Sequence, residues 1–245
     1  MVVAFEGMDG SGKSTIAKEV AEKENFKYEP QRLISLLNID EEKFNEFIKL
    51  IRTSKNKKLA FFFYSFRCML DNDIKEDTVV ERTMMSTYYF EKDKILEEEW
   101  DNIMTNNIVP DITFVLYASP YIRYQRIQNR NKNDSDLRSS EALKDGYPTM
   151  LEFANKYGIP YIGINTEIYN KQQIIEICSA IIFYYSRISK EERKKFIKKM
   201  NDTYGFDSIY SLGDEKKYEK KLWHNNSRNG TKFNILCVWI IKKRI

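Results

Sequence analysis

Residues 2–15, with the sequence VVAFEGMDGSGKST, constrain the fold of this chain more than any other segment. An apolar run leads into the pattern G-x-x-x-x-G-K-[ST], which begins at Gly7 and ends at Ser14. Backbone N–H groups can surround a phosphate where bulky Cβ atoms are absent, and the N-terminus of a following helix adds positive potential. The pattern therefore predicts a buried strand, a phosphate-binding loop and a helix, in that order.

The chemistry of the loop predicts a role for its side chains. We expect Lys13 to reach the β- and γ-phosphates of ATP, and the Ser14 hydroxyl to ligate Mg²⁺. The loop residues expected to bind ATP are Asp9, Gly10, Ser11, Gly12, Lys13, Ser14 and Thr15. A glycine-rich turn with a solvated lysine is the alternative structure for this segment.

Short β-branched or aromatic runs alternate with longer amphipathic segments along the chain. Strands are expected at 2–5, about 26–28, 78–80, 112–117 and 161–164. Helices are expected at 13–23, 41–52, 59–71, 83–105, 120–130, 140–157 and 171–186. This alternation predicts an α/β fold with a mainly parallel five-stranded sheet and helices on both faces, a three-layer sandwich. Ligands of such sheets lie beyond the carboxyl ends of the strands.

Composition narrows the class of protein. Of the 245 residues, 42% are apolar and 31% are charged, which indicates a folded globular chain. A net charge of +4 fits small anionic ligands and does not indicate nucleic-acid binding. His224 is the only histidine, which argues against Ser-His-Asp catalysis, Cys-His catalysis and multi-histidine metal sites.

The cysteine pattern and the apolar runs suggest a location. Cys68, Cys178 and Cys237 are far apart and have no metal-ligand spacing, so a reducing cytoplasm is expected. No secretory signal is expected, because the first strand already begins at residue 2. No membrane span is expected, because the longest apolar run, 233–241, is too short to cross a bilayer.

The chain changes character after residue 189. Residues 190–200, KEERKKFIKKM, predict a strongly charged helix, and a polar stretch and a final apolar segment follow. We therefore expect a nucleotide-binding domain over 1–189 and a C-terminal extension over 190–245. The extension could be an added strand, a docking element or a poorly ordered tail.

Four segments resemble the thymidylate kinase family of nucleoside monophosphate kinases. They are FEGMDGSGKST (5–15), FFFYSFR (61–67), VVERTMMSTYYF (79–90) and PDITFVLYASPYIRYQRIQNR (110–130), and the likeness covers about residues 2–167. The resemblance implies a P-loop NTPase fold with a mobile lid at about 129–141. It also implies transfer of the γ-phosphoryl group of Mg-ATP to a deoxynucleoside monophosphate, with dTMP as the expected acceptor, and a homodimer.

The resemblance implies roles for residues of the acceptor site. Phe63 matches the ring that stacks on thymine, and Arg67 matches the arginine that holds the acceptor phosphate. Arg82 and Ser86 match the family's Asp-Arg-Tyr segment and the serine that follows it. Asp9 matches an acid that would accept a hydrogen bond from the 3′-hydroxyl of the acceptor sugar.

Charge adds to these expectations. A monophosphate acceptor and ATP repel each other, so arginines are needed between them, and Arg32 lies with Arg67 and Arg82 just after or between strands. Glu81 is expected to hold Mg²⁺ through water. Phe90, or a neighbouring tyrosine, is expected to close the sugar pocket.

The segment from 126 to 138 is expected to supply a further cation. Arg126, Arg130, Lys132 and Arg138 surround the polar loop NKNDSD, and the phosphate loop carries no arginine at Gly10 or Ser11. An arginine that closes over the transferring phosphoryl group would stabilise its charge and exclude water. We expect Arg130 or Arg138 to do this together with Lys13 and Arg82, and Arg126 to bind ATP.

Two alternatives remain open from the sequence. Glu81-Arg82-Thr83 is closer to the Glu-Arg-Ser of deoxynucleoside kinases, and Glu29-Pro30 resembles the Glu-Pro that carries their catalytic base. In that case Glu29 would activate the 5′-hydroxyl of a deoxynucleoside such as thymidine; otherwise it belongs to the acceptor site. A P-loop ATPase or switch module that signals through the extension is the second alternative.

Overall fold

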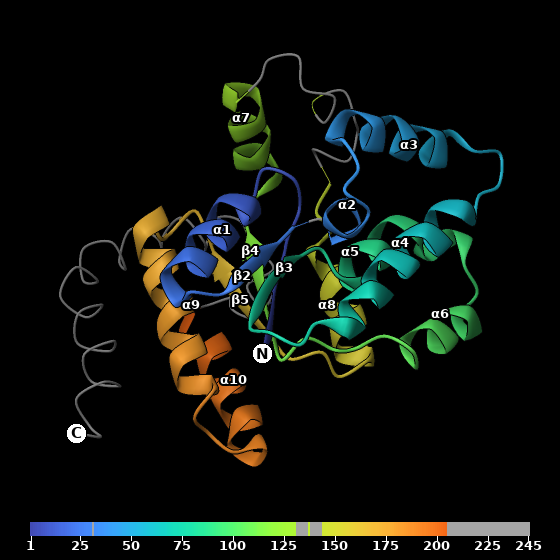
Figure 1. Cartoon of the computed structure of the whole chain (residues 1–245). Helices are drawn as coiled ribbons and strands as arrows, with labels where there is room; N and C mark the ends of the chain where they lie inside the picture. Colours follow the sequence, from blue (N-terminus) through green and yellow to red (C-terminus); the bar gives the residue numbers. More distant parts are fainter. Residues whose placement is uncertain (31, 131–136, 138–143, 205–245) are drawn as a thin grey trace, which may run out of the picture.

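The protein, seen in a computed structural model, is built on one central sheet with helices on both sides (Figure 1). The structure describes residues 1–30, 32–130, 137 and 144–204. Within these residues, no helix combines the length and the apolar character that a membrane span requires.

The sheet contains five strands, as expected from the sequence. They are β1 (Val2–Glu6), β2 (Lys27–Glu29), β3 (Thr78–Glu81), β4 (Ile112–Tyr117) and β5 (Tyr161–Asn165). Their order is β2-β3-β1-β4-β5, and every neighbouring pair is parallel. From β1 the chain goes to the edge strand β2, returns to β3 beside β1, and then crosses to β4 and β5 on the other side, so a crevice forms beyond the carboxyl ends of β1, β3 and β4. The predicted α/β fold is confirmed.

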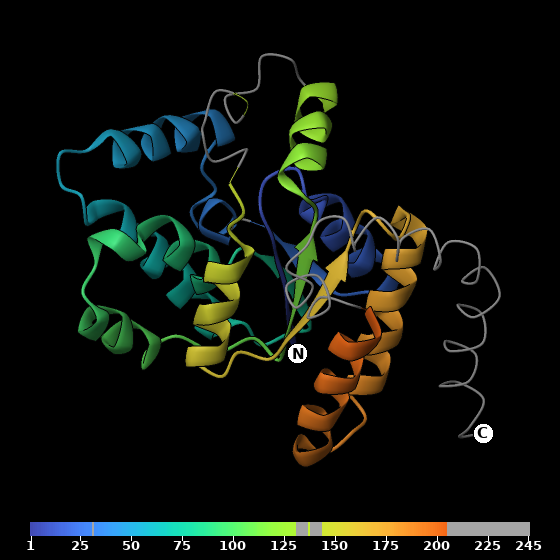
Figure 2. The same ribbon diagram turned by 180° about the vertical axis from the view of Figure 1, so that it is seen from behind.

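Helices cover both faces of the sheet (Figure 2). On one face lie α1 (Lys13–Glu24), α9 (Lys171–Tyr185) and α10 (Lys190–Tyr204). On the other face lie α4 (Leu59–Met69), α5 (Met84–Glu91), α6 (Glu97–Met104) and α8 (Tyr147–Lys156). Three more helices, α2 (Arg32–Leu37), α3 (Glu41–Thr53) and α7 (Pro120–Arg130), follow β2 and β4 and lie beyond the carboxyl ends of the strands (Figure 1).

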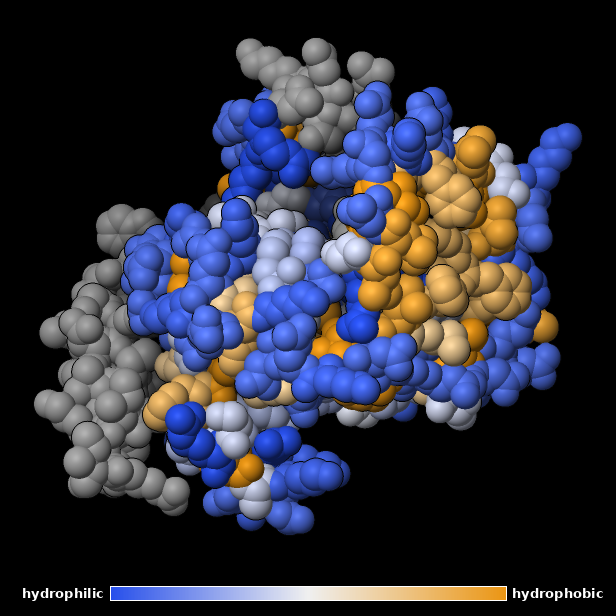
Figure 3. All heavy atoms as spheres, viewed as in Figure 1, coloured by the Kyte–Doolittle hydropathy of each residue, from blue (hydrophilic) through white to orange (hydrophobic). Residues whose placement is uncertain are grey.

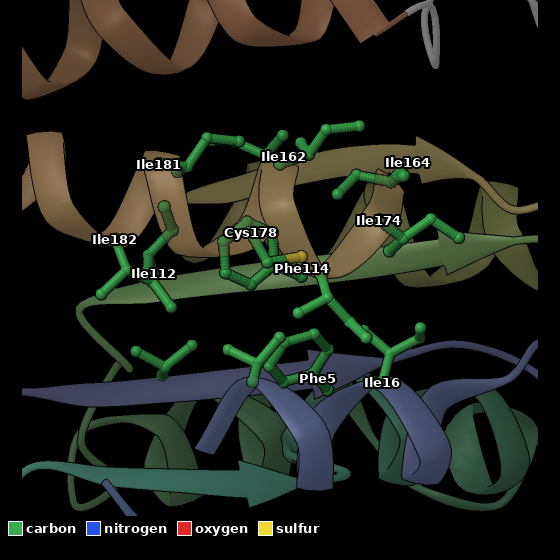
Figure 4. Close-up of a cluster of buried hydrophobic side chains, with 14 of the residues drawn as sticks. Phe5, Ile16, Ile112, Phe114, Ile162, Ile164, Ile174, Cys178, Ile181 and Ile182 are labelled. Carbon is green, nitrogen blue, oxygen red and sulfur yellow. The ribbon is translucent and has the colours of Figure 1, made fainter. Parts of the chain in front are cut away.

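The core between the sheet and α1 and α9 is made of β-branched and aromatic side chains (Figure 4). Phe5 of β1 and Phe114 of β4 have ring centroids 5.2 Å apart, and Ile16, Ile174 and Cys178 pack on them from the helices. These strands are buried on both faces, which explains why they read as continuous apolar runs. This packing holds α1 against β1 and therefore orients the loop that joins them.

Helix α10 belongs to this core, although the sequence suggested that the domain ends at residue 189. Phe196 and Met200 are buried against the α9 side of the sheet. The buried Asn201 side chain accepts a hydrogen bond from the Gly163 N–H at 2.9 Å and donates one to the Tyr161 carbonyl at 3.0 Å. The helix thereby satisfies backbone groups of the edge strand β5. Residues 205–245 lie outside the described residues.

Several helix boundaries differ from expectation. The helix expected at 83–105 is two helices, α5 and α6, separated by a 3₁₀ turn at Lys92–Lys94 and an extended Ile95-Leu96 pair. Burial of Ile95 pulls the chain inward there, and the Glu99 carboxylate accepts the Leu96 N–H at 3.1 Å, which starts α6. Helix α4 ends in a 3₁₀ turn at Leu70–Asp73, and the six-residue α2 was not expected.

Candidate active site

The loop between β1 and α1 has a backbone that only glycine adopts easily. Gly7 has φ of +144° and Gly10 has φ of +81°. A Cβ atom on Gly7 would lie 2.6 Å from the Leu116 carbonyl oxygen, and one on Gly10 would lie 2.7 Å from the Arg123 carbonyl oxygen. The loop is therefore pressed against β4 and α7, and the glycines are needed for this close approach.

Lys13 begins α1 and is almost fully buried, with 7% of its surface exposed. Burial, followed by the charge of the neighbouring Arg82, lowers the pKa of Lys13 to about 8. Its Nζ lies 4.0 Å from Oδ1 of Asp9. A desolvated ammonium group at the start of a helix interacts strongly with an anion that enters the loop.

Arg82 directly follows β3 and reaches the same loop. Its guanidinium pairs with the Asp9 carboxylate, and Arg82 adopts a left-handed φ of +58°. Two hydrogen bonds maintain this strained backbone: the Arg82 N–H donates to the Phe5 carbonyl at 3.1 Å, and Arg67 Nη2 donates to the Arg82 carbonyl at 2.8 Å. Arg67 of α4 and Arg82 therefore meet opposite the phosphate loop.

A carboxylate of β1 supports this segment. Glu6 is fully buried and accepts hydrogen bonds from the N–H and hydroxyl groups of Thr83, at 2.6 and 2.7 Å. It also accepts the Ser86 N–H at 3.2 Å and the Ser86 hydroxyl at 2.5 Å. Ser86 was expected to bind the acceptor, but the structure places it beneath the site, where its hydroxyl is bonded to Glu6.

Hard oxygen ligands gather beside Lys13. The Ser14 hydroxyl donates to Oε2 of Glu81 at 2.6 Å, and the Tyr28 hydroxyl donates to Oε1 of the same carboxylate. Hydroxyl and carboxylate oxygens suit Mg²⁺. No group of three or more His, Cys, Asp or Glu side chains that could hold a metal occurs within the described ranges, so a cation here would need phosphate oxygens as further ligands.

Glu29, which ends β2, and Arg32, which follows it, were expected to bind the acceptor but interact with neighbouring side chains. Glu29 is buried and accepts a hydrogen bond from the Ser35 hydroxyl at 2.8 Å. Arg32 begins α2 and lies near Asp71, whose pKa burial raises to about 6 although Arg67 and Arg32 oppose the rise. Arg67, Arg32 and Glu29 thus all lie close enough to Asp71 to influence its pKa.

The expected aromatic residues pack on other rings. Phe63 of α4 meets Phe47 of α3 edge to face, with centroids 5.5 Å apart, and lies 6.4 Å from Phe44. Phe90, at the end of α5, is 39% exposed and contacts the Tyr89 ring at 4.8 Å. Helix α3 therefore covers part of Phe63, which the sequence did not indicate.

Helix α7 supplies arginines to the loop. Arg126 Nη1 donates to the Thr166 hydroxyl and Nη2 to the Thr166 carbonyl, both at 2.8 Å, and Nη1 lies 3.4 Å from the Gly10 carbonyl. Arg130, one turn later on α7, is exposed and lines the same cleft as Arg126. Arg138 lies outside the described residues.

These side chains enclose a cleft of about 480 Å³. Its lining residues are Asp9, Gly10, Gly12, Lys13, Ser14, Thr15, Tyr28, Pro30, Arg67, Glu81, Arg82, Arg126, Ile127 and Arg130. The cleft thus joins the phosphate loop to Arg67 and Arg82. Ser11, Glu29, Arg32, Phe63, Ser86 and Phe90, also expected at the site, do not line it.

Sequence reasoning missed three residues of the site. Tyr28 lines the cleft and bonds Glu81, and its position before Glu29-Pro30 was the available signal. The fully buried Tyr147 donates its hydroxyl to the Leu116 carbonyl at 2.7 Å and accepts the Met8 N–H at 3.4 Å, which ties α8 to the loop. Arg123 is fully buried under the loop, and no pattern in the sequence distinguished it from an exposed helical arginine.

Comparison with known proteins gives consistent similarities. A protein-family model described as thymidylate kinase matches residues 5–175. A probable thymidylate kinase of Methanocaldococcus jannaschii is 28% identical over 200 residues, which cover 77% of this chain and 97% of that protein. A thymidylate kinase of Leptospira interrogans is 28% identical over 165 residues, which cover 61% of this chain and 80% of that protein.

Solved structures share the fold. Deoxyadenosine kinase from M. mycoides with bound dATP matches with a TM-score of 0.53 at 18% identity, covering 73% of this chain and 97% of that one. Thymidylate kinase from Ehrlichia chaffeensis matches with a TM-score of 0.50 at 20% identity, covering 74% of this chain and 98% of that one.

Proposed function

The chain belongs to the thymidylate kinase family, whose activity is the transfer of the γ-phosphoryl group of ATP to dTMP, and we propose that the cleft between the phosphate loop and Arg67 is where it performs this reaction. The observation that supports this site most directly is the convergence of Arg67 and Arg82 on the space in front of Lys13. A nucleoside triphosphate and a second phosphate group repel each other, so cations are needed on two sides of the cleft. Lys13, Arg67 and Arg82 supply them.

The donor is held by the loop. Backbone N–H groups between Asp9 and Thr15 surround the β- and γ-phosphates, and Lys13 contributes its desolvated charge. Arg126, which links the loop to Thr166 at the end of β5, lies where the rest of ATP enters. Arg130 lies above it and is the described arginine best placed to neutralise charge on the transferring phosphoryl group.

The acceptor is held from the other side. Arg67 and Arg82 orient the monophosphate, which is already ionised and needs no base. Asp9 pairs with Arg82 in this structure, and we propose that the acceptor phosphate takes over Arg82 while Asp9 accepts a hydrogen bond from the sugar. Phe63 lies one turn before Arg67 on α4, and Arg32 is the first residue of α2; neither lines the cleft, so Phe63 would contact the base and Arg32 the acceptor phosphate only from the periphery.

Ser14 and Glu81 fit a divalent cation. Ser14 and Glu81 would help to hold Mg²⁺, which would neutralise charge on the β- and γ-phosphates. The Ser14 hydroxyl would then exchange its hydrogen bond with Glu81 for the cation, and Tyr28 would continue to orient the Glu81 carboxylate.

The experiment that tests this function measures ADP release by the purified chain with dTMP and thymidine as separate acceptors. We expect turnover with dTMP to exceed turnover with thymidine, and Arg67→Met to raise the KM for dTMP by about a hundredfold, the loss of a charge-assisted contact. Arg187→Met, at an exposed arginine after α9, is the matched control and should leave both values unchanged. Faster turnover of thymidine would refute the proposal and favour a nucleoside kinase.

Glu29 provides a second test that separates a monophosphate kinase from a deoxynucleoside kinase. A nucleoside kinase would need Glu29 as a base, but its carboxylate is buried against Ser35 and does not line the cleft. Glu29→Gln should therefore lower kcat with dTMP by less than about tenfold. A complete loss of activity would restore the deoxynucleoside kinase alternative.

We further propose that the protein forms a homodimer through α3 and α4. Four apolar side chains on these helices are largely exposed: Phe47 (44%), Leu50 (69%), Phe62 (50%) and Phe66 (52%). Figure 3 shows a broad apolar area on the side of the molecule where α3 and α4 lie. Such a surface on a folded chain is typical of an interface. Light scattering after chromatography should give twice the chain mass, and Leu50→Glu with Phe62→Glu should halve it; a monomeric wild-type protein would refute the dimer.

A further inference from the structure

Arg123 is the most unusual charged residue of the described chain. It lies on α7, and 0% of its surface is exposed. Arginine is rarely buried to this extent unless its charge is matched. Its Nη1 donates to the Asp9 carbonyl at 3.3 Å, and its Nη2 donates to the Lys144 carbonyl.

Both of these acceptors are uncharged. Within the residues that the structure describes, none of the ion pairs involves Arg123. The carboxylate of Asp9, the residue whose carbonyl accepts from Arg123, is paired with Arg82. Burial alone would raise the pKa of Asp9, but Arg82, Lys13 and Arg123 together hold it below its ordinary value. Glu6 and Glu81 also lie near Lys13 and Arg82, so Arg123 is the cation of this group that has no carboxylate of its own among the described residues. A buried guanidinium in this position favours an additional anion nearby.

The position of Arg123 identifies where that anion binds. The Gly10 backbone lies directly on the backbone of Arg123, because a Cβ on Gly10 would be 2.7 Å from the Arg123 carbonyl. The guanidinium therefore lies behind the loop, on the side opposite the cleft, and the Asp9 carbonyl lies between them. In a poorly hydrated region, a charge acts through a thin layer of backbone with little screening.

We propose that Arg123 attracts the polyphosphate of the nucleotide from behind the loop and so acts as a long-range positioning residue for ATP, in place of an arginine within the loop itself. The inference rests on the proposed binding of ATP by this loop. Its distinctive consequence is that the contribution of Arg123 grows with the number of phosphates on the ligand and, because the buried charge is little screened, changes little with salt.

The opposing explanation is that Arg123 merely braces the loop through its two hydrogen bonds. Two substitutions separate these roles, since Arg123→Lys keeps the charge and loses the two-pronged donor, whereas Arg123→Gln keeps a donor and loses the charge. If Arg123 only holds the loop in place, its two hydrogen-bond donors are required. If it attracts the polyphosphate at long range, its charge is required.

The experiment measures equilibrium binding of ATP, ADP, AMP and inorganic pyrophosphate to the full chain by calorimetry, at low and high potassium chloride. We expect Arg123→Gln to weaken the binding of ATP and pyrophosphate about tenfold and that of AMP by less than about threefold, with similar losses at low and high salt. Arg123→Lys should remain within about threefold of wild type for all four ligands. Arg187→Met is the control and should match wild type.

Equal losses in both variants, or a loss in Arg123→Gln that is the same for AMP and ATP, would overturn the inference. If Arg123→Gln does not fold in a thermal unfolding scan, the lysine variant decides alone: retained ATP affinity supports the inference, and a loss beyond about tenfold overturns it. Failure of the wild-type chain to bind ATP or pyrophosphate would instead refute the proposed function. If the wild-type chain binds ATP and the Arg123→Gln variant binds it equally well, only this inference is refuted.

Discussion

The lowered pKa of Lys13 predicts that ATP binding takes up a proton. In the free protein, burial and the Arg82 charge lower this pKa to about 8 from an ordinary value of 10.5. A bound polyphosphate places negative charge beside the amine and favours its protonated form, so the pKa rises again in the complex. Above pH 8 the free protein is largely neutral at Lys13, and binding must restore the proton.

The size of the effect follows from these two values. If the complex regains the ordinary pKa of 10.5, the ATP dissociation constant is nearly constant below pH 7 and doubles by about pH 8, the free-state pKa. At pH 9 about one molecule in ten of the free protein carries the charge, so affinity should be about tenfold weaker. Proton uptake should rise from about half a proton at pH 8 to nearly one at pH 9.

Calorimetry in two buffers of different ionisation enthalpy measures this uptake directly. The range pH 7.5–9.5 avoids the phosphate's own ionisation, which has a pKa of about 6. Lys13→Arg is the control, because its guanidinium stays charged throughout this range and should bind ATP with no pH dependence, whatever its absolute affinity. A flat wild-type profile, or proton release on binding, would refute the pKa assignment.

Three further outcomes concern stability and are read from urea unfolding. Gly10→Ala should cost at least about 3 kcal/mol because it combines a left-handed φ with the clash against Arg123, whereas Gly12→Ala, at φ +90° with no atom within 4 Å, should cost only about 1 kcal/mol; equal costs would show that the close approach is unimportant. Asn201→Ala should cost about 2 kcal/mol through its two hydrogen bonds to β5 and leave ATP affinity unchanged, and an altered affinity would contradict a purely structural role for α10. Glu6→Gln should cost about 2 kcal/mol and also raise the KM for dTMP, since it loosens the segment after β3; an unchanged KM would separate that segment from the acceptor.

Local sequence was enough to predict the phosphate loop and the alternation of strands and helices. The loop needs glycines at fixed spacing and an adjacent lysine, and strands buried on both faces need uninterrupted apolar residues, so each appears as a short pattern. Helix α7 was predicted with its observed bounds, and β4 likewise. Boundaries shifted where tertiary burial overruled a local tendency, as at Ile95.

The composition of the site depended on contacts between distant segments. Arg67 and Arg82 were predicted because they belong to recognisable motifs, but their mutual hydrogen bond and the left-handed backbone of Arg82 arise only when β3 and α4 pack together. Ser86 carries a family motif and nevertheless turns to Glu6, because a buried carboxylate must be satisfied.

The amino-acid sequence by itself therefore determined that this chain forms a parallel α/β sheet with a phosphate loop at the end of its first strand. Tertiary structure alone decided which polar groups surround that loop, with Tyr28 beside Glu81 and Arg123 behind Gly10, and it also placed α10 against β5. The physical reason is range. Backbone conformation responds to neighbours within a few residues, whereas the energy of a charge depends on every group that packing brings within several ångströms of it.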